Sequence, residues 1–445
     1  MAKNIVLKNA LGDNVVYEKI GKIVLKDDSG ANIEYVEKPA SPDVVEYVPN
    51  SYLCRVIDID GTVLKAEYLA FGEVFALPSP EDLPTHEGLV FDGYSSPIEI
   101  IDNTVTVDDQ NLTVGIVYTT SSGLSEFDIE LTPKTGLSVT LNVSDGDISW
   151  GDGYSQSITQ ATSHTYSNYG KYTITWSGTT MNTHSGNGIF GQNSSTYNYY
   201  CTDVRFANIT QIGSYAFFNC NSLRGTTIPM SVNTINTGAF DACKILEFLV
   251  IPPLVEKINS QFCMNSYLLK NVILPHNINN IDGQAFSYCH SLNDVYIPKN
   301  VTNIGNKAFE RCYGLSQIII PSGVESIGSY AFDNCTGLTC DIIIPDSVKT
   351  IGQNAFSYCY GINRVKMSKN VGSIPYQLFV YNYGVVYYDF TSHTSIPTLN
   401  SNGLTGLNYI SKIYVPDNLY DSWKTATNWS AWSAYIYKAS DMPAE

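Results

Sequence analysis

The most regular feature of the chain is an apolar residue followed by proline, which returns at an almost constant interval in the second half. The steps between successive prolines are 23, 23, 23, 23 and 24 residues. Between two such dipeptides come an isoleucine, an Ala-Phe pair, a cysteine and a leucine. One unit is too small to bury these apolar side chains, but stacked units bury them against each other, so the pattern predicts a solenoid. The dipeptides are Ile228-Pro229, Ile251-Pro252, Leu274-Pro275, Ile297-Pro298, Ile320-Pro321 and Ile344-Pro345.

Each unit predicts its own local structure. The run that ends at the Ile-Pro dipeptide is β-like, and we expect proline to end the strand because it has no N–H group to donate. The Ala-Phe segment is expected to form a helical turn. In the third unit, Gln261-Phe262 replaces Ala-Phe one residue early, and Asn265 lies near the cysteine position. A degraded eighth unit is formed by Ile374, Leu378-Phe379 and Asn382.

These units resemble the leucine-rich repeats of BspA-like surface proteins of the Treponema pallidum type, which read roughly IG-x-x-AF-x-x-C-x-x-L-x-x-x-x-IP. Ile212-Gly213, Ala216-Phe217, Cys220 and Leu223 match this pattern. The resemblance covers about half of the chain and implies a leucine-rich-repeat solenoid over residues 203–400. It also implies a C-terminal cap over residues 401–445 that shields the last apolar layer. The alternative for this segment is a ligand site built on Trp423, Trp429 and Trp432.

Six of the ten cysteines occupy the cysteine position of the repeat. Equivalent side chains in a stack point the same way, so disulfides between neighbours would distort it. We therefore expect buried thiols that act as small apolar side chains. No C-x-x-C or C-x-x-H cluster occurs in the sequence, so a zinc site is not expected. The six residues are Cys220, Cys243, Cys289, Cys312, Cys335 and Cys359.

Residues 1–48 alternate short β-like runs with turn residues. The opening Met1-Ala2-Lys3-Asn4-Ile5-Val6-Leu7-Lys8-Asn9 is similar to the first domain of many bacteriophage and prophage structural proteins, which implies an N-terminal β anchor domain. Residues 49–122 are expected to form a small β-rich domain. Within it, Asp58-Ile59-Asp60-Gly61 has acidic residues typical of a calcium loop but lacks the later ligands of an EF-hand, so a hairpin turn is favoured.

Residues 123–178 are expected to form an immunoglobulin-like sandwich. Ser149-Trp150-Gly151-Asp152-Gly153, followed by His164-Thr165-Tyr166 and Tyr172, resembles the PKD family. The resemblance implies core positions for Trp150 and Tyr172 and a hydrogen bond within the domain for His164. Residues 179–202 are expected to be a junction and the first solenoid layer, with a flexible linker as the alternative. A cation site, which is less favoured, would use Asp145, Asp147 and Asp152.

The expected fold class is therefore mainly β and multidomain, with small N-terminal β domains, a PKD/Ig-like β-sandwich and a leucine-rich-repeat solenoid with a C-terminal cap. The formal net charge of −17 disfavours contact with phosphate backbones, so no nucleic-acid partner is expected. No window is apolar enough for membrane insertion, and the start shows no signal peptide. No nucleophile, P-loop or H-E-x-x-H motif occurs. We expect no enzyme, no catalytic residues, no cofactor and no bound metal.

The solenoid sequence also suggests a binding face. Successive side chains of a strand point to opposite faces, so the residue two positions before each proline should face outward. An outward column should be polar, but this one is apolar from residue 250 to 343. Because contiguous exposed apolar surface marks interfaces, we predict that this face contacts a partner or is buried in an oligomer. The alternative is that β-branched residues simply stabilise the strands. The candidate partner-binding residues are Phe248, Val250, Ile273, Tyr296, Ile319 and Ile343.

These expectations favour a non-enzymatic binding or adhesion protein, namely a bacteriophage or prophage virion protein of the fibre, receptor-binding or surface-decoration type. Its repeats would recognise a host cell-surface protein or glycan. Its N-terminal domains would contact other virion proteins, and it would form a homo-oligomer. One alternative is a BspA-like adhesin on the bacterial cell surface. Another is an accessory binding module of a carbohydrate-active system.

Overall fold

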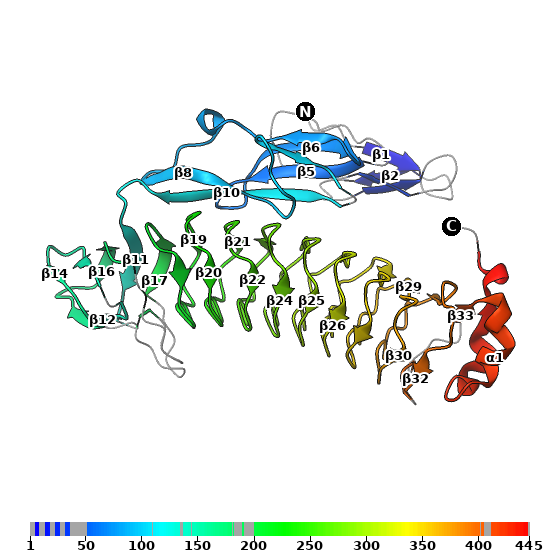
Figure 1. Cartoon of the computed structure of the whole chain (residues 1–445). Helices are drawn as coiled ribbons and strands as arrows, with labels where there is room; N and C mark the ends of the chain where they lie inside the picture. The colour runs from blue at the N-terminus through cyan, green and yellow to red at the C-terminus, as the bar shows by residue number, and fades with distance from the viewer. Residues whose placement is uncertain are drawn as a thin grey trace.

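In the computed structural model, a β domain lies beside a long solenoid that begins at an antiparallel β structure and ends at a short helix (Figure 1). The structure describes residues 51–443 except 109, 134–136, 144, 180, 182–188, 191–199, 401 and 405–410, together with four strands before residue 50. These are β1 (Ile5–Lys8), β2 (Asn14–Tyr17), β3 (Ile23–Lys26) and β4 (Asn32–Tyr35), paired as two antiparallel hairpins. The β-like runs expected there are confirmed, and the remainder of the expected anchor domain lies outside the described residues.

The domain beside the solenoid, hereafter the docked domain (residues 51–120), contains a four-stranded sheet in the order β6-β5-β10-β8 and a β7-β9 pair. The expected hairpin turn over residues 58–61 is confirmed, because Gly61 has a φ of +85° and donates its N–H to Asp58 O at 3.0 Å. Val56, Phe75 and Val114 are fully buried in the core of this domain. The elements are β5 (Ser51–Ile57), β6 (Val63–Ala70), β7 (Val74–Ala76), η1 (Pro80–Asp82), β8 (Leu89–Ser95), β9 (Thr104–Thr106) and β10 (Leu112–Thr120).

The following segment is an antiparallel β structure that runs directly into the solenoid. Its larger sheet has the order β14-β13-β16-β11-β17-β19, in which β17 pairs with β11 on one side and with the first solenoid strand on the other. Most of the expected junction over residues 179–202 lies outside the described residues. The elements are β11 (Ser125–Leu131), β12 (Ser138–Leu141), β13 (Asp147–Ser149), β14 (Ser155–Ser157), β15 (Thr162–Thr165), β16 (Gly170–Trp176) and β17 (Cys201–Arg205).

The residues singled out in the PKD-like motif lie where the resemblance implies. Trp150 is fully buried, and Tyr172 packs against the same core while partly exposed. His164 Nε2 lies 2.7 Å from Asp152 Oδ2, and its ring stacks on Trp150. This side chain is therefore held inside the domain by both polar and aromatic contacts.

The solenoid contains two sets of parallel strands, and equivalent strands of successive turns pair in register (Figure 1). In one set the strands end at or before the repeat's apolar-Pro position, as expected, but the strands that end at Lys366 and Asp389 do so where no proline follows. This set contains β19 (Gly225–Thr227), β21 (Phe248–Val250), β23 (Asn271–Ile273), β27 (Ile342–Ile343), β29 (Arg364–Lys366), β31 (Tyr387–Asp389) and β33 (Lys412–Val415). The other contains β18 (Gln211–Ile212), β20 (Thr234–Ile235), β22 (Lys257–Ile258), β24 (Asn280–Ile281), β25 (Asn303–Ile304), β26 (Ser326–Ile327), β28 (Thr350–Ile351), β30 (Ser373–Ile374) and β32 (Thr398–Leu399).

The Ala-Phe arc is a series of tight turns and not the helical turn expected from the sequence. Two residues of each arc have positive φ, for example Gln284 at 59° and Tyr288 at 64°. Phe286 donates its N–H to Ala308 O of the next unit at 2.8 Å, whereas Cys289 donates within its own arc. A helix would direct its N–H groups along its own axis. In the arc, every second N–H group instead donates to a carbonyl oxygen of the next unit. These hydrogen bonds join successive turns.

The third unit lies in register with its neighbours, which corrects the one-residue shift expected from its sequence. Cys263 donates its N–H to Ala285 O, just as the phenylalanine of the next unit donates to the following alanine. Phe262-Cys263 therefore replaces Ala-Phe with the large and small side chains exchanged. Ser266, and not Asn265, takes the cysteine position, because its hydroxyl donates to the preceding unit at 2.9 Å.

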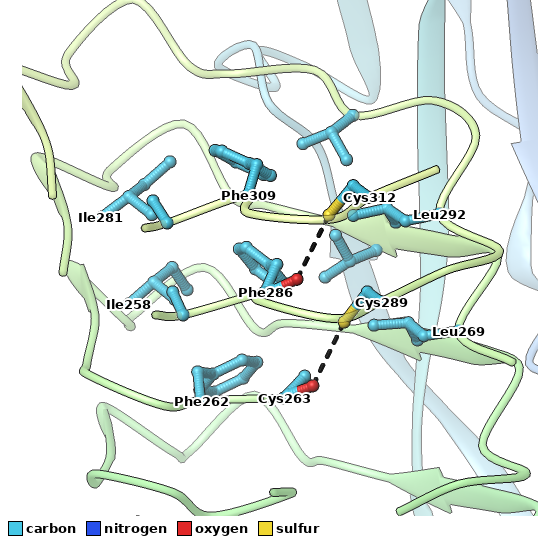
Figure 2. Close-up of a cluster of buried hydrophobic side chains, with 14 of the residues drawn as sticks. Ile258, Phe262, Cys263, Leu269, Ile281, Phe286, Cys289, Leu292, Phe309 and Cys312 are labelled. Atoms are coloured by element: carbon cyan, nitrogen blue, oxygen red, sulfur yellow. Dashed lines mark hydrogen bonds between the residues drawn. The ribbon is translucent and has the colours of Figure 1, made fainter. Parts of the chain in front are cut away.

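A column of phenylalanine rings fills the solenoid, and Figure 2 shows part of it. Phe309 stacks on Phe286 with ring centroids 5.4 Å apart and on Phe332 at 5.3 Å. Phe262 reaches the column from the alanine position and meets Phe240 and Phe286 edge to face. The exchange in the third unit therefore keeps the column continuous but rotates one ring.

Beside this column runs the cysteine column. All ten cysteines lie in the described part of the chain, and each is a thiol rather than half of a disulfide, as expected. Burial raises the pKa of Cys289 and Cys312 well above the usual range, so both thiols keep their protons. Each Sγ–H then donates to a carbonyl of the preceding unit, from Cys289 to Cys263 O at 3.1 Å and from Cys312 to Phe286 O at 3.2 Å (Figure 2).

The C-terminal segment packs on the last solenoid turns. Trp423 and Trp429 are buried against Phe390, which makes these two core side chains, whereas Trp432 is half-buried. The Trp429 indole N–H donates to Pro397 O at 2.8 Å. The elements after β33 are η2 (Asp417–Leu419), α1 (Tyr420–Thr425), η3 (Ser430–Tyr435), β34 (Ile436–Lys438) and η4 (Ala439–Asp441).

Asp241 provides a pH test of the arc structure. Burial raises the pKa of this carboxyl to about 7, although Asn265 donates to it at 3.2 Å. Because the folded state holds the proton more tightly than the unfolded chain, this group stabilises the fold at low pH and loses that effect as pH rises from about 4 to about 7. Asp241→Asn should therefore raise the free energy of unfolding at pH 8, by about 1.4 kcal/mol for each unit of the pKa shift.

Urea denaturation at pH 5 and pH 8 measures this effect. The variant should lose less stability between the two conditions than the natural chain. Asp341→Asn, at an exposed position of the solenoid, is the control and should change neither value. Equal losses for Asp241→Asn and the natural chain would show that the buried carboxyl is not the source of the pH dependence.

Candidate functional site

The structure places the six candidate partner-binding residues along one face, but in two different environments. Phe248 and Ile273 are only 8% and 5% exposed and pack with Val250 against Ile57 of the docked domain. Tyr296 is half-buried and donates its hydroxyl to Asp108 of the same domain. The first four candidates therefore contact another part of their own chain, an arrangement that the sequence did not indicate.

The docked domain meets the solenoid mainly through β10, which crosses the strands of successive turns (Figure 1). Near its C-terminal end, Thr119 Oγ1 donates to Phe206 O at 3.3 Å. Midway along the strand, Gly115 faces Val250 and Ile273. Near its start, Asn111 lines a cavity together with Asp294. One strand of the docked domain thus contacts several turns of the repeat array.

Gly115 is required by this close approach. A Cβ atom at this position would lie 2.7 and 2.8 Å from the two methyl groups of Val250. Such distances are shorter than van der Waals contact, so any larger residue would force the two surfaces apart. A glycine inside an apolar β-strand is typical of close backbone approach, so Gly115 is a sequence signal for this interface on the side of the docked domain.

Polar contacts fix the position of the docked domain. Asp108 is buried, accepts a hydrogen bond from the Tyr296 hydroxyl and forms an ion pair with Lys299 at 3.1 Å. The N–H of His276 donates to Ser96 O at 2.8 Å. Because these groups are oriented and partly removed from water, they select one docked position over sliding of the two apolar surfaces. Isolated acidic and hydroxyl residues are common on any β domain, so the sequence did not mark them.

The remainder of the face is uncovered by the described residues. Ile319 is 43% exposed and Ile343 is 58% exposed, and they lie on successive turns at and beyond the end of the docked domain. Both occupy the same repeat position as Val250 and Ile273, but only Ile343 lies in a strand, β27. The apolar column is therefore divided into a covered part and an open part.

Within the described residues, no three His, Cys, Asp or Glu side chains gather as they would around a metal ion. Asp145, Asp147 and Asp152 each bond to a different partner, namely Thr179, Ser157 and His164. None of the helices in the described part of the chain has the length and apolar character that crossing a bilayer requires.

A stack of parallel-paired turns with an extended face defines a repeat-scaffold protein, a class that typically offers surfaces for binding. The family model described as BspA type Leucine rich repeat region matches residues 190–316 and 302–426, with 6 copies. The chain belongs to this family, as its repeats suggested, and no enzyme family is indicated.

Several solved structures are similar to part of this chain. A leucine rich cell surface protein from Faecalibacterium prausnitzii A2-165 is 24% identical, covers 52% of this chain and 70% of its own, and has a TM-score of 0.32. The pneumococcal vaccine antigen PcpA is 18% identical over 54% of this chain and 66% of its own, with a TM-score of 0.34. The T. pallidum leucine rich repeat protein is 23% identical over 43% and 75%, with a TM-score of 0.26. No curated protein matches the sequence.

Proposed function

We propose that this protein is a non-enzymatic binding protein that recognises a host-surface partner through the open part of its repeat face. The observation that carries this proposal is the exposure of Ile319 and Ile343 where the apolar column leaves the docked domain. Exposed apolar side chains on successive turns form the kind of patch that marks an interface. Membership of the BspA type repeat family supports a binding role.

We further propose that the protein is a component of a bacteriophage or prophage particle. The similarity of its first nine residues to phage structural proteins supports this location. Its N-terminal domains would contact other virion proteins, and it would assemble as a homo-oligomer. The antiparallel pairing of β11 with β16 and the buried Trp150 support a PKD-like sandwich that acts as a spacer. The C-terminal segment around Trp423 would act as the cap of the array.

A bacterial surface adhesin is the second candidate. It is favoured by the repeat family itself, which covers the solenoid but gives no sign of a virion. Mass spectrometry of purified phage particles and of washed cells from the source culture separates the two. Stoichiometric peptides of this chain in the particles are expected. Their absence from particles, together with their presence on cells, would replace the virion proposal by the adhesin.

The open face itself is tested by charge insertion. The double variant Ile319→Lys and Ile343→Lys should lose at least about tenfold in affinity for cells of the source culture, because lysine removes the apolar contact. Its free energy of unfolding should change by less than about 0.5 kcal/mol, since both side chains are exposed. Leu254→Lys, at an exposed position outside the column, is the control. Undiminished binding by the double variant would exclude this face as the partner site.

A further inference from the structure

The seam between the docked domain and the solenoid holds a cavity of about 210 Å³ that is open to solvent. Its walls come from both parts of the chain, and binding sites occur preferentially at such junctions between domains. The cavity adjoins the open part of the face, because Ile319 belongs to both. The side chains that matter for its chemistry are Tyr52, Gln110, Asn111, Asp294, Gln317 and Ile319.

Gln110 is the most informative residue of this cavity. It is only 8% exposed and lines the cavity wall. Its side-chain amide can donate hydrogen bonds through its amino group and accept them through its carbonyl oxygen. An amide at this position can therefore bond to a molecule inside the cavity.

The solenoid wall supplies complementary groups. Gln317 and Asp294 occupy equivalent positions on successive turns, four residues before the repeat's Pro position, and both line the cavity. On the opposite wall, Asn111 Oδ1 accepts the N–H of Leu53 at 2.9 Å, which leaves the Asn111 amino group to donate into the cavity. The cavity thus offers amide donors, amide acceptors and one carboxylate acceptor.

The charges at the site decide among ligand classes. Among the described residues, no Lys or Arg lines the cavity, and the nearby Arg55 is engaged with Asp294 at 3.6 Å and Thr113 at 2.9 Å. Phosphate or an acidic sugar would therefore lack a cation to pair with. Hydroxyl groups both donate and accept, as the amides of Gln110 and Gln317 do. Tyr52 and Ile319 add apolar surface for the C–H groups of a sugar ring.

We propose that this cavity binds one neutral sugar residue, held by Gln110, Asn111 and Gln317, so that the docked domain and the solenoid recognise a glycan together. The inference deepens the proposed function and rests on it, because it specifies the host-surface partner as a neutral glycan. The size of the cavity suits a single ring. Further residues of the same glycan would extend over the open face past Ile319.

The test uses the full-length protein and the methyl glycosides of glucose, galactose and mannose, with binding measured by saturation-transfer NMR and titration. At least one glycoside should bind with a Kd on the order of 1 mM, the range for a small ligand with few contacts. Gln110→Ala and Gln317→Ala should each weaken that binding about tenfold, the loss expected for one hydrogen-bonding partner. Asp341→Ala, one turn after Gln317 at the equivalent position and outside the cavity, should leave it unchanged.

Two outcomes would overturn the sugar site: none of the three glycosides binds, or one binds equally well to both glutamine variants. Gln317 is exposed, so its variant remains informative if the buried Gln110→Ala fails to fold. The cell-binding measurement separates this inference from the proposed function. Cell binding that no glycoside inhibits would reject the sugar site and leave the binding function intact, with a protein as the partner. Glycoside binding without cell binding would reject the function and keep the site.

Discussion

Gly115→Val should release the docked domain from the solenoid while both parts remain folded. The added side chain would enter the space held by Val250, where even a Cβ would approach to 2.7 Å. Overpacking of this kind costs about 1–3 kcal/mol, and here it falls on a contact between two separately folded surfaces. Valine itself favours strands, so β10 keeps its pairing with β5 and β8 inside the docked domain.

Small-angle X-ray scattering and hydrogen exchange measure the release. The radius of gyration should increase, and the amides near Phe248 and Ile273 should exchange faster because their cover is lost. Gly372→Val is the matched control, since a Cβ at Gly372 would meet nothing within 4 Å. A scattering profile for Gly115→Val identical to that of the natural chain would mean that the docked position tolerates the clash, and the interface would have to be reconsidered.

Phe309→Ala is expected to cause the largest loss of stability of any single change in the solenoid. Its ring lies between those of Phe286 and Phe332 and is fully buried. Truncation of a buried phenylalanine costs about 3–5 kcal/mol, because the apolar contact is lost and a cavity remains. Each turn contacts only its neighbours, so a weakened turn also uncouples the two halves of the array.

Urea denaturation followed by circular dichroism tests this expectation. The natural chain and Phe309→Ala should differ in midpoint, and the variant transition should broaden or divide as the two halves lose their coupling. Tyr313→Ala removes a neighbouring exposed aromatic ring and should cost less than about 0.5 kcal/mol. Comparable losses for the two variants would mean that the phenylalanine column is not the main source of stability.

The features that the sequence predicted correctly are those repeated at a fixed interval. The isoleucine, phenylalanine, cysteine and leucine of one unit can be buried only against the same residues of the next, so their spacing alone predicts the solenoid. The family match covers this same region. The turn geometry was less accessible, because left-handed residues such as Tyr288 carry no uniform residue type. The third unit shows the same limit, since Phe262-Cys263 keeps the volume of Ala-Phe but reverses its order.

The repeat sequence does not predict that the docked domain packs on the solenoid. For this reason the whole apolar column was expected to bind a partner, although part of it is covered by the same chain. The outward column from Val250 to Ile343 indicates that an apolar surface exists. The pattern does not indicate which part of the chain, or which partner, covers that surface. Coverage depends on the shape of β10 and on single contacts such as Asp108 with Tyr296. The cavity at the seam is hidden for the same reason, because its walls are far apart in the chain and become neighbours only after docking.

The orientation of β10 has a consequence for how the solenoid would respond to a pulling force. Tension along the solenoid axis acts on the turns in series, and each turn resists only with its own bonds to the next. β10 runs alongside these turns from the level of Phe206 to that of Asp294. Because it contacts several turns at once, it can share the force that would otherwise act only on the bonds between neighbouring turns. The turns beyond Ile319 have no such reinforcement among the described residues. Under a pulling force these later turns should extend first. The turns in contact with the docked domain should remain folded at that force.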